Sequence, residues 1–257
     1  MYFNNVHILI YLAIAIIGLI VGKFIAWCNI RFPENKKIFS KEFFEENKKG
    51  IEKNYIIMIT VAIIYVALLY KFGLKSEFIK NLDLIKFLIL TPMLVSAFFV
   101  DLKHRIIPNR LNLTMFEIGL IIAFIYGITN INMAKDMILG MFTGAGIFIA
   151  ITLLGGLIAG KEAMGLGDVK LMGALGLYFG INSIAEISLL AFFIAAISSI
   201  FILIIRIVIL KIKDEYIPFG PFLVISAVAC IFLPANIVFT VFLGFCTAIS
   251  NKILELF

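Results

Sequence analysis

The sequence predicts an all-α membrane protein, a polytopic bundle of eight or nine transmembrane helices. Of its 257 residues, 63% are apolar and 15% are charged, whereas soluble domains average about 45–50% and about 25%. The apolar residues fall into uninterrupted blocks of about 20 residues, the length of a helix that crosses a bilayer. This pattern excludes a disordered, fibrous or soluble nucleic-acid-binding protein, so no nucleic acid partner is expected.

Nine apolar blocks follow one another along the chain. They occupy residues 5–28, 54–70, 84–100, 111–129, 136–160, 169–181, 184–210, 217–234 and 236–256. We expect each block to be helical, because lipid offers no hydrogen-bond partner to an exposed backbone. The last block decides between eight and nine crossings. Since no repeat and no Pro/Gly/Ser linker divides the chain, residues 1–257 are predicted to form a single integral membrane domain.

Basic residues predict the orientation of the chain. Residues 29–53 contain Arg31, Lys36, Lys37, Lys41, Lys48, Lys49 and Lys53, and the positive-inside rule therefore places this loop in the cytoplasm. Counting crossings from there puts residues 101–110, 161–170 and 206–216 on the same side. The segment 71–86 disagrees, because it carries four lysines and falls on the outer side.

Two aspartates at the edges of apolar blocks form the candidate catalytic pair. Asp101 directly follows the block LILTPMLVSAFFV, and Asp168 directly precedes VKLMGALGLYFG. The predicted topology places both at cytoplasmic helix ends, and ionisable residues near membrane depth indicate a functional site. Two close carboxyls share one proton over a wide pH range. The ionised member can then take a proton from water while the protonated member hydrogen-bonds the scissile carbonyl.

Each aspartate also has a structural interpretation. Asp168 follows a glycine and precedes an apolar run, which is typical of a helix N-cap. For Asp101 the structural interpretation is an interfacial ion pair with Lys103 or Arg105. The alternative function is a proton- or cation-coupled secondary transporter that uses the same aspartates, and a third is a scaffold for a secretion machine. Carrier sites lie near the bilayer midplane and between repeats. Here both aspartates are predicted at the cytoplasmic boundary and the chain has no repeat, which counts against the transporter.

Three motifs around these aspartates resemble the type IV prepilin peptidase family. They are DLKHRIIPN at 101–109, KEAMGLGDVKL at 161–171 and IPFGPF at 217–222. The first two resemble the active-site signatures of the family and the third its motif near the C-terminus. The G-x-G-D element is shared with other intramembrane aspartyl proteases such as presenilins. The resemblance runs over nearly the whole chain.

This resemblance implies an aspartic endopeptidase whose catalytic residues are Asp101 and Asp168. It assigns a supporting motif consisting of Gly165, Gly167, Lys103, Pro108, Asn109 and Lys170. The substrates it implies are prepilins or pseudopilins with a short basic leader and a hydrophobic helix, cut at the cytoplasmic face. The protein is then expected in the cytoplasmic membrane of a prokaryote, in contact with membrane lipid.

Many family members also methylate the new N-terminus with S-adenosylmethionine. The segment 22–33 keeps the glycine, phenylalanine, arginine and proline of the G-S-F-L-N-x-x-I-x-R-x-P stretch of bifunctional members, but it has Lys23 and Ala26 in place of the serine and asparagine. The loop 29–53 contains no cysteine, whereas many bifunctional members carry two zinc-binding C-x-x-C pairs there. We therefore expect no metal, no cofactor for proteolysis, and S-adenosylmethionine only if the methyltransferase activity is present.

Overall fold

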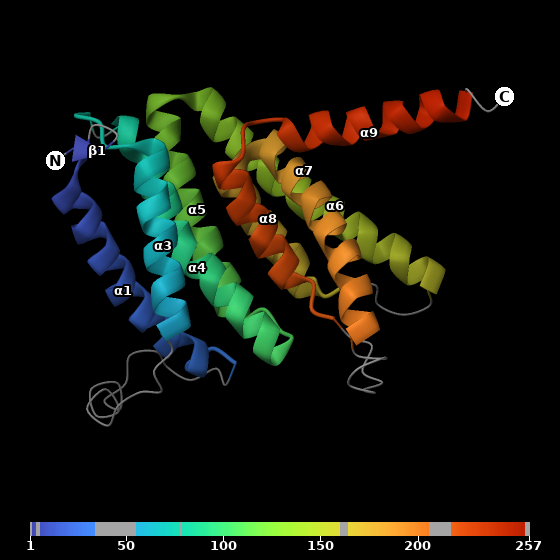
Figure 1. The fold of residues 1–257 in the computed structure, drawn as a ribbon, viewed down its shortest axis with the longest axis horizontal. Coiled ribbons are helices and arrows are strands. Elements are labelled where there is room, and N and C mark those ends of the chain that lie inside the picture. Colours follow the sequence, from blue (N-terminus) through green and yellow to red (C-terminus); the bar gives the residue numbers. More distant parts are fainter. Residues whose placement is uncertain are drawn as a thin grey trace.

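The computed structural model describes residues 2–3, 6–33, 55–77, 79–159, 164–205 and 217–254. A short hairpin of β1 (Tyr2–Phe3) and β2 (Val6–His7) precedes a bundle of helices (Figure 1). The helices are α1 (Ile8–Arg31), α3 (Tyr55–Phe72), η1 (Ile79–Asn81), α4 (Leu82–His104), α5 (Asn109–Thr129), α6 (Ile131–Ala159), α7 (Leu166–Ile204), α8 (Gly220–Phe232) and α9 (Ile237–Leu254). The predicted all-α fold is confirmed.

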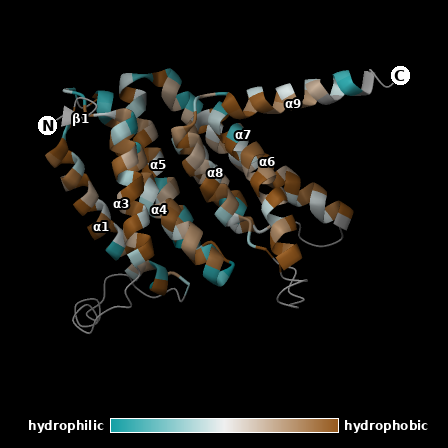
Figure 2. Ribbon diagram, viewed as in Figure 1, coloured by the Kyte–Doolittle hydropathy of each residue, from teal (hydrophilic) through white to brown (hydrophobic). Residues whose placement is uncertain are grey.

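The helices have the length and surface of membrane spans. Among the described residues, six helices are long and apolar enough to cross a bilayer, and α8 with α9, bent by 105°, adds a seventh if the pair is one span. Figure 2 shows apolar residues along the helices and polar ones gathered toward their ends. The count is thus six or seven where eight or nine were expected. It takes α7 as a single helix, although the predicted blocks 169–181 and 184–210 lie on either side of a break at Gly180, and it takes α8 and α9 as at most one span.

Helix α7 is broken at Gly180, close to the predicted gap between two apolar blocks. Gly180 has φ 76° and ψ 179°, a backbone conformation that is essentially restricted to glycine. The Oδ1 atom of Asp136, on α6, accepts a hydrogen bond from the backbone N–H of Ile181 at 3.2 Å. Asp136 therefore caps the second half of α7, which begins directly after the break.

Glycines on α6 show that the two halves of α7 run in opposite directions. A Cβ on Gly140 would lie 2.5 Å from the carbonyl oxygen of Gly176 and 2.6 Å from the break itself. A Cβ on Gly144 would lie 2.5 Å from the carbonyl oxygen of Met172 and 3.0 Å from Ile184. From Gly140 to Gly144 of α6, the neighbouring residue therefore changes from 176 to 172 in the first half of α7 and from 180 to 184 in the second half. The first half is antiparallel to α6. Helix α7 therefore starts at the end of the bundle that holds the α4–α5 turn (Figure 1).

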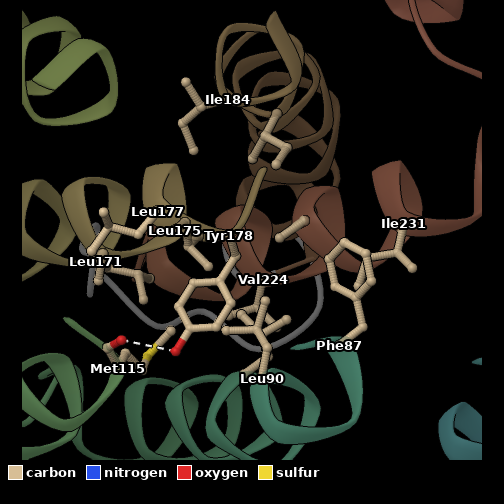
Figure 3. Close-up of a cluster of buried hydrophobic side chains, with 14 of the residues drawn as sticks. Phe87, Leu90, Met115, Leu171, Leu175, Leu177, Tyr178, Ile184, Val224 and Ile231 are labelled. Atoms are coloured by element: carbon tan, nitrogen blue, oxygen red, sulfur yellow. Dashed lines mark hydrogen bonds between the residues drawn. The ribbon is translucent and has the colours of Figure 1, made fainter. Parts of the chain in front are cut away.

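A buried core joins α4, α5, α7 and α8. Leu90, Tyr178 and Val224 are 0–4% exposed and pack together from three of these helices. The Tyr178 hydroxyl donates a hydrogen bond of 2.8 Å to the backbone carbonyl of Met115 on α5 (Figure 3). This core fixes the relative positions of the four helices whose ends carry the three sequence motifs.

Three of the four lysines that contradict the positive-inside count have partners in the structure. Lys71 donates to a backbone carbonyl of α8. Lys80 pairs with Glu77 at 2.6 Å, and the buried Lys86 pairs with Asp83 at 3.0 Å. Only Lys80 and Lys86 lie beside a carboxylate, and the segment 71–86 still disagrees with the predicted orientation. Residues 34–53 of the first loop, 160–163 and the loop 206–216 lie outside the described residues.

Candidate active site

Three helix ends carry the site. Asp101 lies in the last turn of α4, Asp168 in the first turn of α7, and Gly220 is the first residue of α8. The backbone N–H of Gly220 donates a hydrogen bond to the Asp101 carboxylate. The Asp168 carboxyl lies within electrostatic range of that of Asp101. The structure therefore brings together residues from all three motifs, which are spread over positions 101 to 222 of the sequence.

Asp101 is held in a tight space. The residue is 5% exposed, and its helix ends one turn later at Arg105, whose left-handed backbone (φ 57°) donates a 2.8 Å hydrogen bond to the Asp101 carbonyl. A Cβ on Gly220 would lie 2.5 Å from Asp101 Oδ2. Only glycine lets the start of α8 approach the carboxylate this closely.

Asp168 is the third residue of α7 and does not cap it. The N-cap position belongs to Gly165, and no side chain makes a capping hydrogen bond there. The helix-cap interpretation of Asp168 is therefore wrong. Gly167 lies against the turn before α5, since a Cβ there would be 3.3 Å from Ile107 Cβ. This contact fixes the start of α7 beside the polypeptide that follows Asp101.

Most of the supporting residues predicted from the motifs surround the start of α7. Pro108 is buried at the N-cap of α5, and Asn109 Oδ1 accepts a hydrogen bond of 2.8 Å from Lys170 Nζ. Lys103 lies elsewhere, because it lines a polar cavity of about 300 Å³ between α1, α3 and α4 together with Asn29. The structure thus groups five of the six supporting positions and places Lys103 in a different cavity.

Sequence reasoning missed Asn112. This residue is 3% exposed, and its Nδ2 donates a hydrogen bond of 3.1 Å to the carbonyl oxygen of Gly167. Its Oδ1 has no hydrogen-bond partner among the described residues. The available signal was an amide three positions after Asn109, on a helix face that also carries Leu111 and Met115. A lone buried amide on such a face needs a partner.

Within the described ranges, no three His, Cys, Asp or Glu side chains are grouped so that they could hold a metal ion. Residues 88–204 match the Type IV leader peptidase family. This segment belongs to that family. The leader peptidase segment contains both aspartates, while the motif at 217–222 lies beyond it. The family match is therefore shorter than the near-complete resemblance that the three motifs predicted.

The chain is also similar to curated proteins, over stretches that are longer than the leader peptidase segment. A prepilin leader peptidase/N-methyltransferase of Legionella pneumophila is 35% identical over 153 residues, which are 57% of this chain and 49% of that protein. One of Xanthomonas campestris is 30% identical over 175 residues, 66% of this chain and 55% of that protein. One of Aeromonas hydrophila is 31% identical over 139 residues, which are 54% of this chain and 46% of that protein. The chain thus spans about half the length of these relatives, and no solved structure matches it.

Proposed function

We propose that this chain is an intramembrane aspartyl endopeptidase that removes the basic leader from prepilin-like proteins. The observation that carries the proposal is that the helix ends bearing Asp101 and Asp168 meet at one end of the bundle: Ile107 lies beside both Gly167 and Gly220, and Gly220 lies against Asp101 Oδ2. The family of residues 88–204 and the relatives' names support leader cleavage as the reaction. The proposed location is the cytoplasmic membrane of a prokaryotic cell, with the pair facing the cytoplasm.

The two carboxyls divide the acid and base roles. Burial disfavours the ionised form of both carboxyls, but only Asp101 accepts the Gly220 N–H, which stabilises its ionised form relative to that of Asp168. The negative charge beside it then favours the shared proton on Asp168. Asp101 takes a proton from water as the oxygen attacks the scissile carbonyl, and Asp168 gives its proton to the carbonyl oxygen. When the tetrahedral intermediate breaks its C–N bond, the leaving amine takes the proton from Asp101, and Asp168 recovers its own from the intermediate's hydroxyl.

Co-expression tests the proposed activity in cells. The chain is produced with a membrane protein that has a basic leader, a glycine and an apolar helix, in a host without its own leader peptidase. Leader removal is expected, seen as a mass loss equal to that of the leader. A transporter that uses the same aspartates would leave this substrate intact, so unprocessed substrate beside correctly inserted enzyme contradicts the proposal.

The cytoplasmic placement of the site predicts a labelling pattern. In a variant without the three native cysteines, Asn47→Cys and Ala163→Cys are expected to react with a membrane-impermeant thiol reagent only when the cytoplasmic side is exposed. Asn130→Cys, between α5 and α6 at the other end of the bundle, is expected to react in intact cells. Labelling of positions 47 and 163 from opposite sides would contradict a common active-site face.

We further propose that N-methylation by this chain is weak or absent, with S-adenosylmethionine as the cofactor of any residual activity. The support is Lys23 and Ala26 in the segment 22–33 and the lack of cysteine in the first loop. Mass spectrometry of the processed product, with S-adenosylmethionine supplied, is expected to show an unmodified N-terminus. Efficient addition of a single methyl group would overturn this proposal without affecting the peptidase.

A further inference from the structure

An apolar groove begins at the residue after Asp168. Its volume is about 500 Å³, and it lies between α5, α6 and the first half of α7, starting at Val169. Leu113 and Phe142, on its walls, are 56% and 64% exposed. From Asn109 to Phe116 the groove follows α5 for about 10 Å, or roughly two helical turns, at 1.5 Å per residue. It therefore leads from the level of the catalytic pair into the membrane region.

Small residues line the part of the groove where α6 and α7 meet. Ala145 of α6 and Gly173 and Ala174 of α7 lie there, and a Cβ on Gly173 would be 3.3 Å from Ala145 Cβ. In membranes, small residues allow the backbone of another helix to approach closely. The contact between Gly173 and Ala145 shows that these residues bring α6 and α7 of this chain together, and they leave a groove floor without bulky side chains on which a further helix can pack.

Asn112 marks the catalytic end of the same groove. It lines the groove, and its Nδ2 faces the Gly167 carbonyl, which can only accept. The amide orientation is thereby fixed and leaves Oδ1 as a buried acceptor without a partner among the described residues. The first four N–H groups of a helix have no partner within that helix. The side chains around Oδ1 cover it in this structure, so a donor reaches it only when they are displaced. A helix that begins beside Asp168 carries such donors, whereas a lipid acyl chain carries none.

We infer that this groove binds the first two turns of the substrate's apolar helix, with Asn112 Oδ1 accepting a backbone N–H at the start of that helix. The inference rests on the proposed function, and it assigns the α5–α6–α7 surface as the site that positions the cleavage point. Because the groove starts one residue after Asp168, a helix seated in it has its leader side at the catalytic pair.

Ala145→Phe tests the inference by filling the groove. Ala150→Phe is the matched control, since Ala150 is an exposed residue of the same helix outside the groove. Each variant is given a full-length substrate in vesicles and a short peptide that carries the leader and the cleavage site but stops one or two residues after the cut. We expect Ala145→Phe to lower kcat/KM for the full-length substrate about tenfold more than for the peptide, while Ala150→Phe keeps the wild-type ratio. An unchanged ratio in Ala145→Phe overturns the inference.

Crosslinking gives a second test that does not depend on how Ala145→Phe folds. A photoreactive amino acid replaces Leu113 in the Asp168→Asn background, and the full-length substrate is added in vesicles. Adducts to the first two turns of the substrate helix support the inference, and adducts to lipid alone overturn it. A wild-type enzyme that cleaves neither the full-length substrate nor the peptide would instead overturn the proposed function itself.

Discussion

Asp101→Asn and Asp168→Asn are each expected to lower leader cleavage by about 10²–10⁴-fold, the usual contribution of a positioned acid or base. An asparagine has the size of the aspartate but cannot take a proton from water or give one to the carbonyl oxygen. The double variant is expected to be little worse than either single variant, since residues that act as one unit are not additive. The measurement is kcat/KM for leader release by the purified enzymes.

The matched control for these variants is Asp136→Asn. Asp136 lies on α6 and uses one carboxyl oxygen to cap the second half of α7, and an asparagine oxygen can accept the same hydrogen bond. We therefore expect this variant to keep its activity. Two moderate losses that multiply in the double variant would contradict a shared catalytic role for Asp101 and Asp168.

Gly220→Ala is expected to lower leader cleavage by about 10- to 100-fold while leaving the protein folded. The added Cβ would lie 2.5 Å from Asp101 Oδ2 and 3.1 Å from Ile107 Cδ1. Either the Asp101 carboxylate or the start of α8 must therefore move, and the N–H hydrogen bond that orients the carboxylate is disturbed. The expected loss is in kcat, because the change acts on the reacting groups and not on the groove.

Gly146→Ala provides the control for this variant. Gly146 lies on α6, where an added Cβ meets nothing within 4 Å, and its replacement is expected to leave kcat unchanged. Thermal unfolding of both variants separates loss of activity from loss of structure. Gly220→Ala with wild-type kcat would show that the contact between α8 and Asp101 has no part in catalysis.

The apolar blocks and the two aspartates could be predicted from the sequence because both depend on local pattern. A run of apolar residues must become a helix in lipid, and the first two motifs place Asp101 and Asp168 at helix ends. The break in α7 also left a signal, since Gly180 falls next to a gap between two blocks. The direction in which the chain turns there depends on Gly140, Gly144 and Asp136 of α6, and so could not be predicted from α7 alone.

Contacts between distant segments account for what the sequence did not reveal. The role of Gly220 depends on the approach of α8 to Asp101, and the free acceptor of Asn112 depends on the position of Gly167. Lys103 was grouped with the site because it belongs to the first motif. On a helix, however, residues two apart face different sides, and Lys103 therefore lines the cavity beside α1 and α3.

The most direct test of the central claim is product analysis with the purified protein in lipid vesicles. A prepilin-like substrate is added, and the masses and end sequences of both products are measured beside an Asp101→Asn/Asp168→Asn double variant. The account predicts one cut at the junction between the basic leader and the apolar helix, made by the wild-type protein and lost in the double variant. A folded wild-type protein that leaves the substrate whole, or a double variant that cuts it equally fast, would contradict the account.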